Sequence, residues 1–342
     1  MRGAYDAGVT NEPARSRLAT LPTPLETGPD LPGDVRVWVK RDDLTGLGVG
    51  GNKARKLEFL CGDAIASGAR SLVTVGAAQS NHCRMTAAAG TVLGLEVHLV
   101  LSGERPEVAT GNQLLSTLFG AQLHFTGAEP SHWGELEIAR EGLVEQLAAD
   151  GAAPYSIPIG GTTAIGALGY LGAFVELMDQ FETADVQPVA IVHASSSGGT
   201  HAGLVAGRAL YRSRGRTDRL PEILAIGVAK GVNHGIPDVA DLARGTLAVA
   251  GFPDVEVEPA DVVLDTRWMG TDYAVPTDEA DRAIGWAARH GGWVLDRTYS
   301  GKGFAGLLGN AAEGRWPGGS DVVFVHTGGL PALFAPGGAP PT

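Results

Sequence analysis

The stretch PVAIVHASSSGGTHAGLVAG (residues 188–207) places an apolar run, a turn of three serines and two glycines, and a helix-forming run in direct succession. A continuous apolar run of this kind indicates a strand that is covered on both faces, as in a parallel sheet. The N–H groups of the turn and the positive end of the following helix would point at one place, which favours a phosphate-ester site. The alternative is a tight strand-to-helix turn that binds nothing.

The same alternation continues outward from this stretch. Further strands are predicted at residues 70–77, 96–102, 121–127, 222–230 and 321–328, and helices at 83–94, 110–119 and 133–149. Alternating strands and helices imply an α/β fold with parallel-rich sheets flanked by helices. Because 342 residues exceed what one core usually serves, we expect a small domain at 54–160 and a large domain formed by 1–53 plus 161–342.

The composition limits which kinds of partner and which cellular compartment fit this chain. The net charge of −12 argues against nucleic acid or an anionic membrane surface as a partner. Cys61 and Cys83 are the only cysteines and lack CxxC spacing, and the chain contains neither a signal-peptide pattern nor a run of about 18 apolar residues. We therefore expect a cytoplasmic protein. None of the nine histidines has metal-site spacing, so no metal is expected.

The loop and helix LGVGGNKARKLEFL (47–60) contain a candidate for covalent catalysis. Lys53 would stand at a helix N-terminus, where the helix dipole lowers the pKa of an ammonium group. Schiff-base chemistry requires a lysine that can be neutral near pH 7. A surface lysine beside a turn is the plain alternative. The glycines of this loop also match G-x-G-x-x-G, but no buried strand precedes them and no ribose-binding acid follows, so a dinucleotide site is not supported.

The stretch VGAAQSNHCRMTAAA (75–89) offers a second site. Ser80, Asn81 and His82 follow a predicted buried strand and precede a helix of small residues. Their side chains and backbone N–H groups could receive a substrate carboxylate. The alternative is a plain helix cap, which Ser and Asn commonly provide.

Taken together, GGNKARKLE, QSNHCR, SSSGGTHAGL and HTGGLPALF resemble the D-cysteine desulfhydrase and 1-aminocyclopropane-1-carboxylate deaminase family. These are fold-type II pyridoxal-phosphate enzymes, similar to the tryptophan synthase β chain. The likeness runs from LPTPLE (21–26) to HTGGLPALF (326–334). It implies pyridoxal 5′-phosphate as cofactor, a small amino acid as substrate, and a homodimer.

The resemblance also implies how the cofactor is held. Lys53 resembles the lysine that binds the cofactor as a Schiff base and, once released, removes the α-proton. Asn81 resembles the partner of the pyridoxal 3′-oxygen. The loop Ser197-Gly198-Gly199-Thr200 resembles the phosphate-binding loop, and Ser300 falls where the family places the partner of the pyridine nitrogen.

The remaining likenesses bear on substrate and reaction. Ser80, with Asn81 and His82, resembles the binder of the substrate carboxylate, and Tyr273 and Tyr299 match two active-site tyrosines that contact the substrate. Cyclopropane deaminases carry glutamate where this chain has Ser300, whereas desulfhydrases carry a neutral hydroxyl residue.

The resemblance therefore favours α,β-elimination of a D-cysteine-like amino acid to pyruvate, ammonia and sulfide. Three alternatives remain: aminocyclopropane carboxylate deamination, lyase action on another β-substituted amino acid such as cysteate, and a non-catalytic pyridoxal-phosphate-binding homologue.

Overall fold

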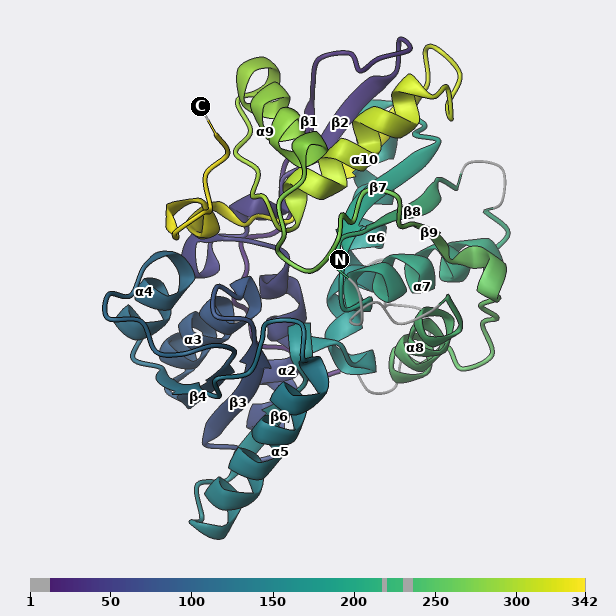
Figure 1. The fold of residues 1–342 in the computed structure, drawn as a ribbon. Helices are drawn as coiled ribbons and strands as arrows, with labels where there is room; N and C mark the ends of the chain where they lie inside the picture. Colours follow the sequence, from purple (N-terminus) through teal and green to yellow (C-terminus); the bar gives the residue numbers. More distant parts are fainter. Residues whose placement is uncertain (1–12, 217–219, 230–235, 342) are drawn as a thin grey trace.

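The computed structural model describes residues 13–216, 220–229 and 236–341, which form two parallel-rich sheets with helices on both faces (Figure 1). The larger sheet has six strands in the order β1-β2-β10-β7-β8-β9. Neighbouring strands pair in parallel except for the antiparallel pair β1 and β2. These strands are β1 (Leu25–Thr27), β2 (Arg36–Lys40), β7 (Ala190–Ser195), β8 (Glu222–Gly227), β9 (Val263–Asp265) and β10 (Asp321–Val325).

The central strand β10 shows why both faces of this sheet carry helices. Its side chains alternate between two apolar clusters, because successive residues of a strand point to opposite faces. Val322 and Phe324 pack on one face with helices α9 (Asp278–Gly291) and α10 (Ser300–Ala312). Val323 and Val325 pack on the other face with helices α6 (Ala164–Ala184), α7 (Gly199–Ser213) and α8 (Ile236–Val249).

The smaller sheet has four parallel strands in the order β5-β4-β3-β6. Its core lies between the sheet and helices α2 and α3, and α5 covers the opposite face. All of its strands fall within the predicted small domain, although the limits of that domain stay a prediction. Its elements are α2 (Lys53–Ala66), β3 (Ser71–Gly76), α3 (Asn81–Leu93), β4 (Glu96–Leu101), α4 (Gly111–Leu118), β5 (Gln122–Phe125), α5 (Trp133–Ala149) and β6 (Pro154–Ile157).

The predicted α/β class is confirmed, and each predicted strand contains an observed strand. Residue 230, the last residue of the strand predicted at 222–230, lies outside the described residues. Four short strands were not predicted: β1, β2, β6 and β9. They have three to five residues each, too few for a hydrophobic period to stand out. The described residues also form short 3-10 helices: η1 (Asp42–Leu44), η2 (Leu47–Val49), η3 (Ile159–Gly161), η4 (Pro259–Asp261) and η5 (Leu330–Phe334). Within the described ranges, no helix combines the length and apolarity needed to cross a membrane.

Candidate active site

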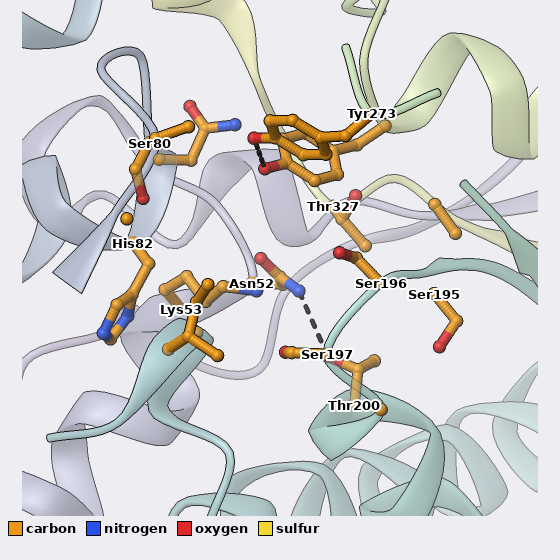
Figure 2. A pocket seen from close by; sticks show the side chains of 18 of the residues that line it. Asn52, Lys53, Ser80, His82, Ser195, Ser196, Ser197, Thr200, Tyr273 and Thr327 are labelled. Atoms are coloured by element: carbon orange, nitrogen blue, oxygen red, sulfur yellow. Dashed lines mark hydrogen bonds between the residues drawn. The ribbon is translucent and has the colours of Figure 1, made fainter. Parts of the chain in front are cut away.

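A cavity lies between the two sheets, where the carboxyl ends of β3, β7 and β10 meet (Figure 2). This edge is where ligands bind in parallel α/β sheets. Among the residues that the structure describes, the wall of the cavity contains no carboxylate, although the whole chain is acidic. The lining residues are Asn52, Lys53, Gly76, Ala77, Ser80, Asn81, His82, Trp133, Ile159, Gly160, Ala194, Ser195, Ser196, Ser197, Gly198, Thr200, Tyr273, Tyr299, Thr327 and Gly328.

Lys53 differs from the other lysines of the described chain. Lys40 forms an ion pair, and the ammonium groups of Lys56 and Lys302 donate to backbone carbonyls. Lys53 has no hydrogen-bond partner among the described residues, and it enters the cavity wall as the first residue of α2. Burial lowers the pKa of its ammonium group to about 8, because a charged amine is poorly solvated there. Burial lowers the pKa of Lys56 as well, but of the lysines that the structure describes Lys53 alone lines the cavity, where it can act as a neutral amine.

Glycines hold the loop that delivers Lys53 to the cavity. Gly50 has φ +76°, and a Cβ atom there would lie 1.9 Å from the Asp43 carbonyl oxygen. Gly51 has φ +131°, which other residues rarely adopt. The backbone N–H of Asn52 then donates to the Thr327 carbonyl at 3.0 Å. The start of α2 is therefore tied directly to the segment that follows β10.

The turn after β7 forms a cradle at the N-terminus of α7. Gly198 has φ +83° and caps the helix, and Gly199 is its first residue. The first N–H groups of a helix have no acceptor within the helix, so they are available to an anion. A Cβ atom on Gly199 would lie 2.5 Å from Lys56 Nζ, so a buried amine stands directly behind the cradle. Glycine backbone, free N–H groups and a nearby lysine together fit a phosphate group.

Side chains on both sides fix this cradle. Asn52 Nδ2 donates to Thr200 Oγ1 at 3.1 Å, which connects the cradle to the residue before Lys53. Thr162 Oγ1 donates to Ser197 Oγ at 2.7 Å. In the view of Figure 2, Lys53 lies between His82 on one side and Ser197 with Thr200 on the other. The predicted phosphate-binding residues and the predicted Schiff-base lysine therefore share one cavity.

The predicted carboxylate-binding segment starts α3. Ser80 caps this helix, and its Oγ accepts from the Cys83 N–H at 3.2 Å. His82 is 2% exposed, and its Nε2 lies 2.9 Å from Thr74 Oγ1. Burial, reinforced by the nearby Lys53 and Lys56, holds the pKa of His82 well below its usual range. His82 is therefore a neutral imidazole at pH 7.

The two predicted tyrosines meet across the cavity from different loops. Their hydroxyl oxygens are 2.5 Å apart. Burial raises the pKa of both Tyr273 and Tyr299, so both carry their protons at neutral pH. Trp133 packs edge-on against Tyr273 with ring centroids 4.8 Å apart. The pair can therefore donate a hydrogen bond or pass a proton at one of the two oxygens.

Ser300 occupies a different position. Its side chain is fully buried and is not among the residues that line the cavity. Ser300 Oγ donates to Asp296 Oδ1 at 2.6 Å and accepts from the Asp296 N–H at 2.8 Å. Ser300 begins α10, so its hydroxyl helps to hold the turn in front of that helix. A contact between Ser300 and the pyridine nitrogen stays a prediction.

Four residues of the site were not singled out from the sequence: Asn52, Lys56, Trp133 and Thr327. Thr327 stands in the segment after β10, and its place at the carboxyl end of a parallel strand was the available signal. Lys56 stands one helical turn after Lys53, a spacing that puts both amines on one face of α2. Nothing in the sequence indicates that Trp133, at the start of α5, would reach the cavity.

Comparison with known proteins agrees with this geometry. Residues 17–328 match a family model described as pyridoxal-phosphate dependent enzyme. The sequence is 38% identical over 328 residues to a D-cysteine desulfhydrase of Klebsiella pneumoniae (strain 342), covering 94% of this chain and 95% of that protein.

Solved structures of other proteins share the fold of this chain. The crystal structure of an ACC deaminase homologue has a TM-score of 0.82 and 36% sequence identity, covering 94% of this chain and 93% of that chain. A hydrogen sulfide-producing enzyme from Fusobacterium nucleatum, with a TM-score of 0.63 and 14% identity, covers 93% of this chain and 98% of that chain and shares the fold.

Proposed function

This chain belongs to the family of pyridoxal-phosphate dependent enzymes, with pyridoxal 5′-phosphate as its cofactor, and from this premise we propose that it eliminates sulfide from a D-cysteine-like amino acid. The reaction consumes water and gives pyruvate, ammonia and hydrogen sulfide, so that all atoms balance. The observation that carries the proposal is a cavity, without an acid among the described residues of its wall, in which Lys53, the α7 cradle and the tyrosine pair come together.

The cavity fits this cofactor at both of its ends. The turn Ser197-Gly198-Gly199-Thr200 would hold the phosphate through backbone N–H groups and the Thr200 hydroxyl, with the Lys56 amine behind Gly199. Lys53 would hold the aldehyde carbon as an imine. We assign the 3′-oxygen to Asn81 and the ring nitrogen to the hydroxyl of Ser300 or of Thr327, which lines the cavity. When bound, pyridoxal phosphate withdraws electrons from the substrate α-carbon.

The chain's own residues would then position the substrate and move protons. Lys53 Nζ, with a pKa near 8, can accept the α-proton in its neutral form. The Ser80 hydroxyl and the backbone N–H of Asn81, which begins α3, would orient the carboxylate. Since Tyr273 and Tyr299 share a short hydrogen bond and both carry protons, one of them can donate to the departing sulfur. His82, being neutral, adds no competing charge beside Lys53.

Ring opening of aminocyclopropane carboxylate is the second candidate, because an ACC deaminase homologue is 36% identical. That reaction needs a stronger electron sink than elimination of a good leaving group. We favour elimination because Ser300 carries a neutral hydroxyl and the cavity wall, as far as it is described, contains no acid.

We also propose a cytoplasmic homodimer. Both cysteines are buried and free, as expected in a reducing compartment. Helix α4 packs against η5, and Leu118 and Phe334 on these elements are 70% and 72% exposed. Large exposed side chains on adjoining elements favour a protein interface, and a second copy of the chain is its simplest occupant.

Product analysis tests the proposed reaction. The purified holoenzyme should release pyruvate from D-cysteine and from β-chloro-D-alanine, and it should form little 2-oxobutyrate from aminocyclopropane carboxylate. L-cysteine tests the stereochemical preference, and Lys53→Ala is the control that should lose turnover. Abundant 2-oxobutyrate, with no pyruvate from any D-amino acid, would establish the deaminase reaction instead.

A further inference from the structure

We propose that Asn112 is a positioning residue, which together with Arg84 fixes the Asn81 side-chain amide with its N–H₂ group toward the cavity. Asn81 would then act on a bound ligand only as a hydrogen-bond donor. The inference rests on the proposed function only in that the cavity holds pyridoxal phosphate; it does not depend on which amino acid is the substrate.

A backbone carbonyl fixes the orientation of Asn112. Its side chain is 1% exposed, and the atom that faces the Gln79 carbonyl oxygen at 2.9 Å must be Nδ2, because a carbonyl only accepts. The same Nδ2 has a second hydrogen, which points to the Asn81 side chain at 3.0 Å. The Asn81 atom on that side must therefore be its oxygen, Oδ1.

Arg84 imposes the same orientation from another side. Its guanidinium is fully buried and donates to the carbonyl oxygens of Gly48 and Gly50, the latter at 3.1 Å. One of its nitrogens lies 3.5 Å from Asn81 Oδ1. Because guanidinium nitrogens only donate, this contact also requires the oxygen of Asn81. With two donors on Oδ1, the Nδ2 group of Asn81 is left on the side of the cavity that Asn81 lines.

Contacts at the start of α4 place Asn112 next to Asn81. Gln79 accepts from the Asn112 N–H at 2.8 Å and donates to the Thr110 carbonyl at 3.2 Å. Gly111 has φ +54°, and a Cβ atom there would lie 2.6 Å from Gln79 Oε1, so only glycine allows this approach. Asn112 Oδ1 has no hydrogen-bond partner among the described residues. A buried unpaired oxygen costs stability, which favours a role in the site over a purely structural one.

The test measures cofactor binding without substrate. Asn112→Asp replaces the donor by a group that only accepts, so the Asn81 amide should turn and present its oxygen to the anionic cofactor. We expect the dissociation constant for pyridoxal phosphate to rise about tenfold or more, which is the effect of losing one hydrogen bond to a charged acceptor. The visible band of the bound cofactor should shift as well. Asn112→Ala removes the donor without adding charge and should show a smaller change in the same direction.

The decisive measurement is the same substitution in an Asn81→Ala background. If Asn112 acts through Asn81, Asn112→Asp should there change the dissociation constant by less than about twofold. Gln113→Glu is the matched control, since it places a carboxylate at the next buried amide of α4. Equal losses in both backgrounds, or an unchanged constant in both Asn112 variants, would overturn the proposal. Failure of D-cysteine turnover alone would leave these binding constants unaffected.

Discussion

The low pKa of Lys53 predicts how fast the apoenzyme captures its cofactor at different pH values. Imine formation requires the neutral amine. With a pKa of about 8 in place of the ordinary 10.5, about 10% of the Lys53 amine is neutral at pH 7, against about 0.03% for an exposed lysine. The cavity thus increases the reactive fraction about 300-fold, equivalent to about 3 kcal/mol of lost ammonium solvation.

The assay follows the visible band as apoenzyme and pyridoxal phosphate are mixed between pH 7 and 10. This range lies above the second pKa of the phosphate, about 6, so the phosphate stays dianionic. The capture rate should rise only about tenfold in total and level off near pH 9, because Lys53 is then fully neutral. A free lysine derivative in the same buffers is the control, and its rate of imine formation should rise several-hundred-fold, at about tenfold per pH unit.

A substitution in the cavity wall should have the opposite effect to burial and raise the pKa of Lys53. Ala77→Asp introduces a carboxylate into a wall whose described residues include none, and an acid in the cavity that Lys53 lines should raise the pKa of its ammonium group. The plateau should then move to higher pH, and capture at pH 7 should slow. A wild-type rate that climbs steadily to pH 10, like the free lysine, would refute the view that burial prepares Lys53 for imine formation.

Three further predictions concern the cradle, the core and the surface. Gly198→Val should release cofactor on dilution, because valine does not tolerate φ +83° and would block the cradle. Thr200→Ala should weaken cofactor binding by about 1.5–3 kcal/mol. Cofactor retention is measured by absorbance after gel filtration, and equal retention in both variants would place the phosphate elsewhere. Glu176→Ala should lower the free energy of unfolding in urea by about 3–5 kcal/mol, because it leaves the buried Lys40 without its ion-pair partner and Arg55 with Asp42 alone. Glu182→Ala, which breaks an exposed pair on the same helix, should cost about 1 kcal/mol or less. Similar costs for the two variants would show that burial of the first pair is unimportant. Phe334→Lys should shift sedimentation from dimer to monomer, and an unchanged profile would exclude this face as the dimer interface.

The sequence predicted the features that depend on local pattern. The strand and turn at 188–199 follow from an apolar run that ends in serines and glycines, and the position of Lys53 follows from the glycine turn before a helix-forming run. Both signals lie within a few residues of one another. The observed β7, α7 and start of α2 agree with them.

The features that escaped prediction depend on contacts between distant segments. Asn112 and Asn81 are 31 residues apart, and no local pattern pairs them. Strand β2 stands between β1 and β10, far from β10 in sequence, and its five residues carry little periodic signal. For Ser300 the resemblance predicts a contact with the pyridine nitrogen, and the alternative is a cap of the turn before Gly301, as serine often provides. In the structure its hydroxyl bonds to Asp296, four residues earlier, which agrees with the cap, and the contact with the cofactor ring stays a prediction.

The central claim is that Lys53 carries the cofactor in the cavity between the two sheets, and reductive labelling tests it most directly. Holoenzyme treated with borohydride, which reduces the carbon–nitrogen double bond, is digested, and the modified peptide is located by mass spectrometry. We predict one pyridoxyl group per chain on Lys53, and none after Lys53→Ala. A label on Lys56 or Lys302, whose nitrogens donate to backbone carbonyls, would contradict it.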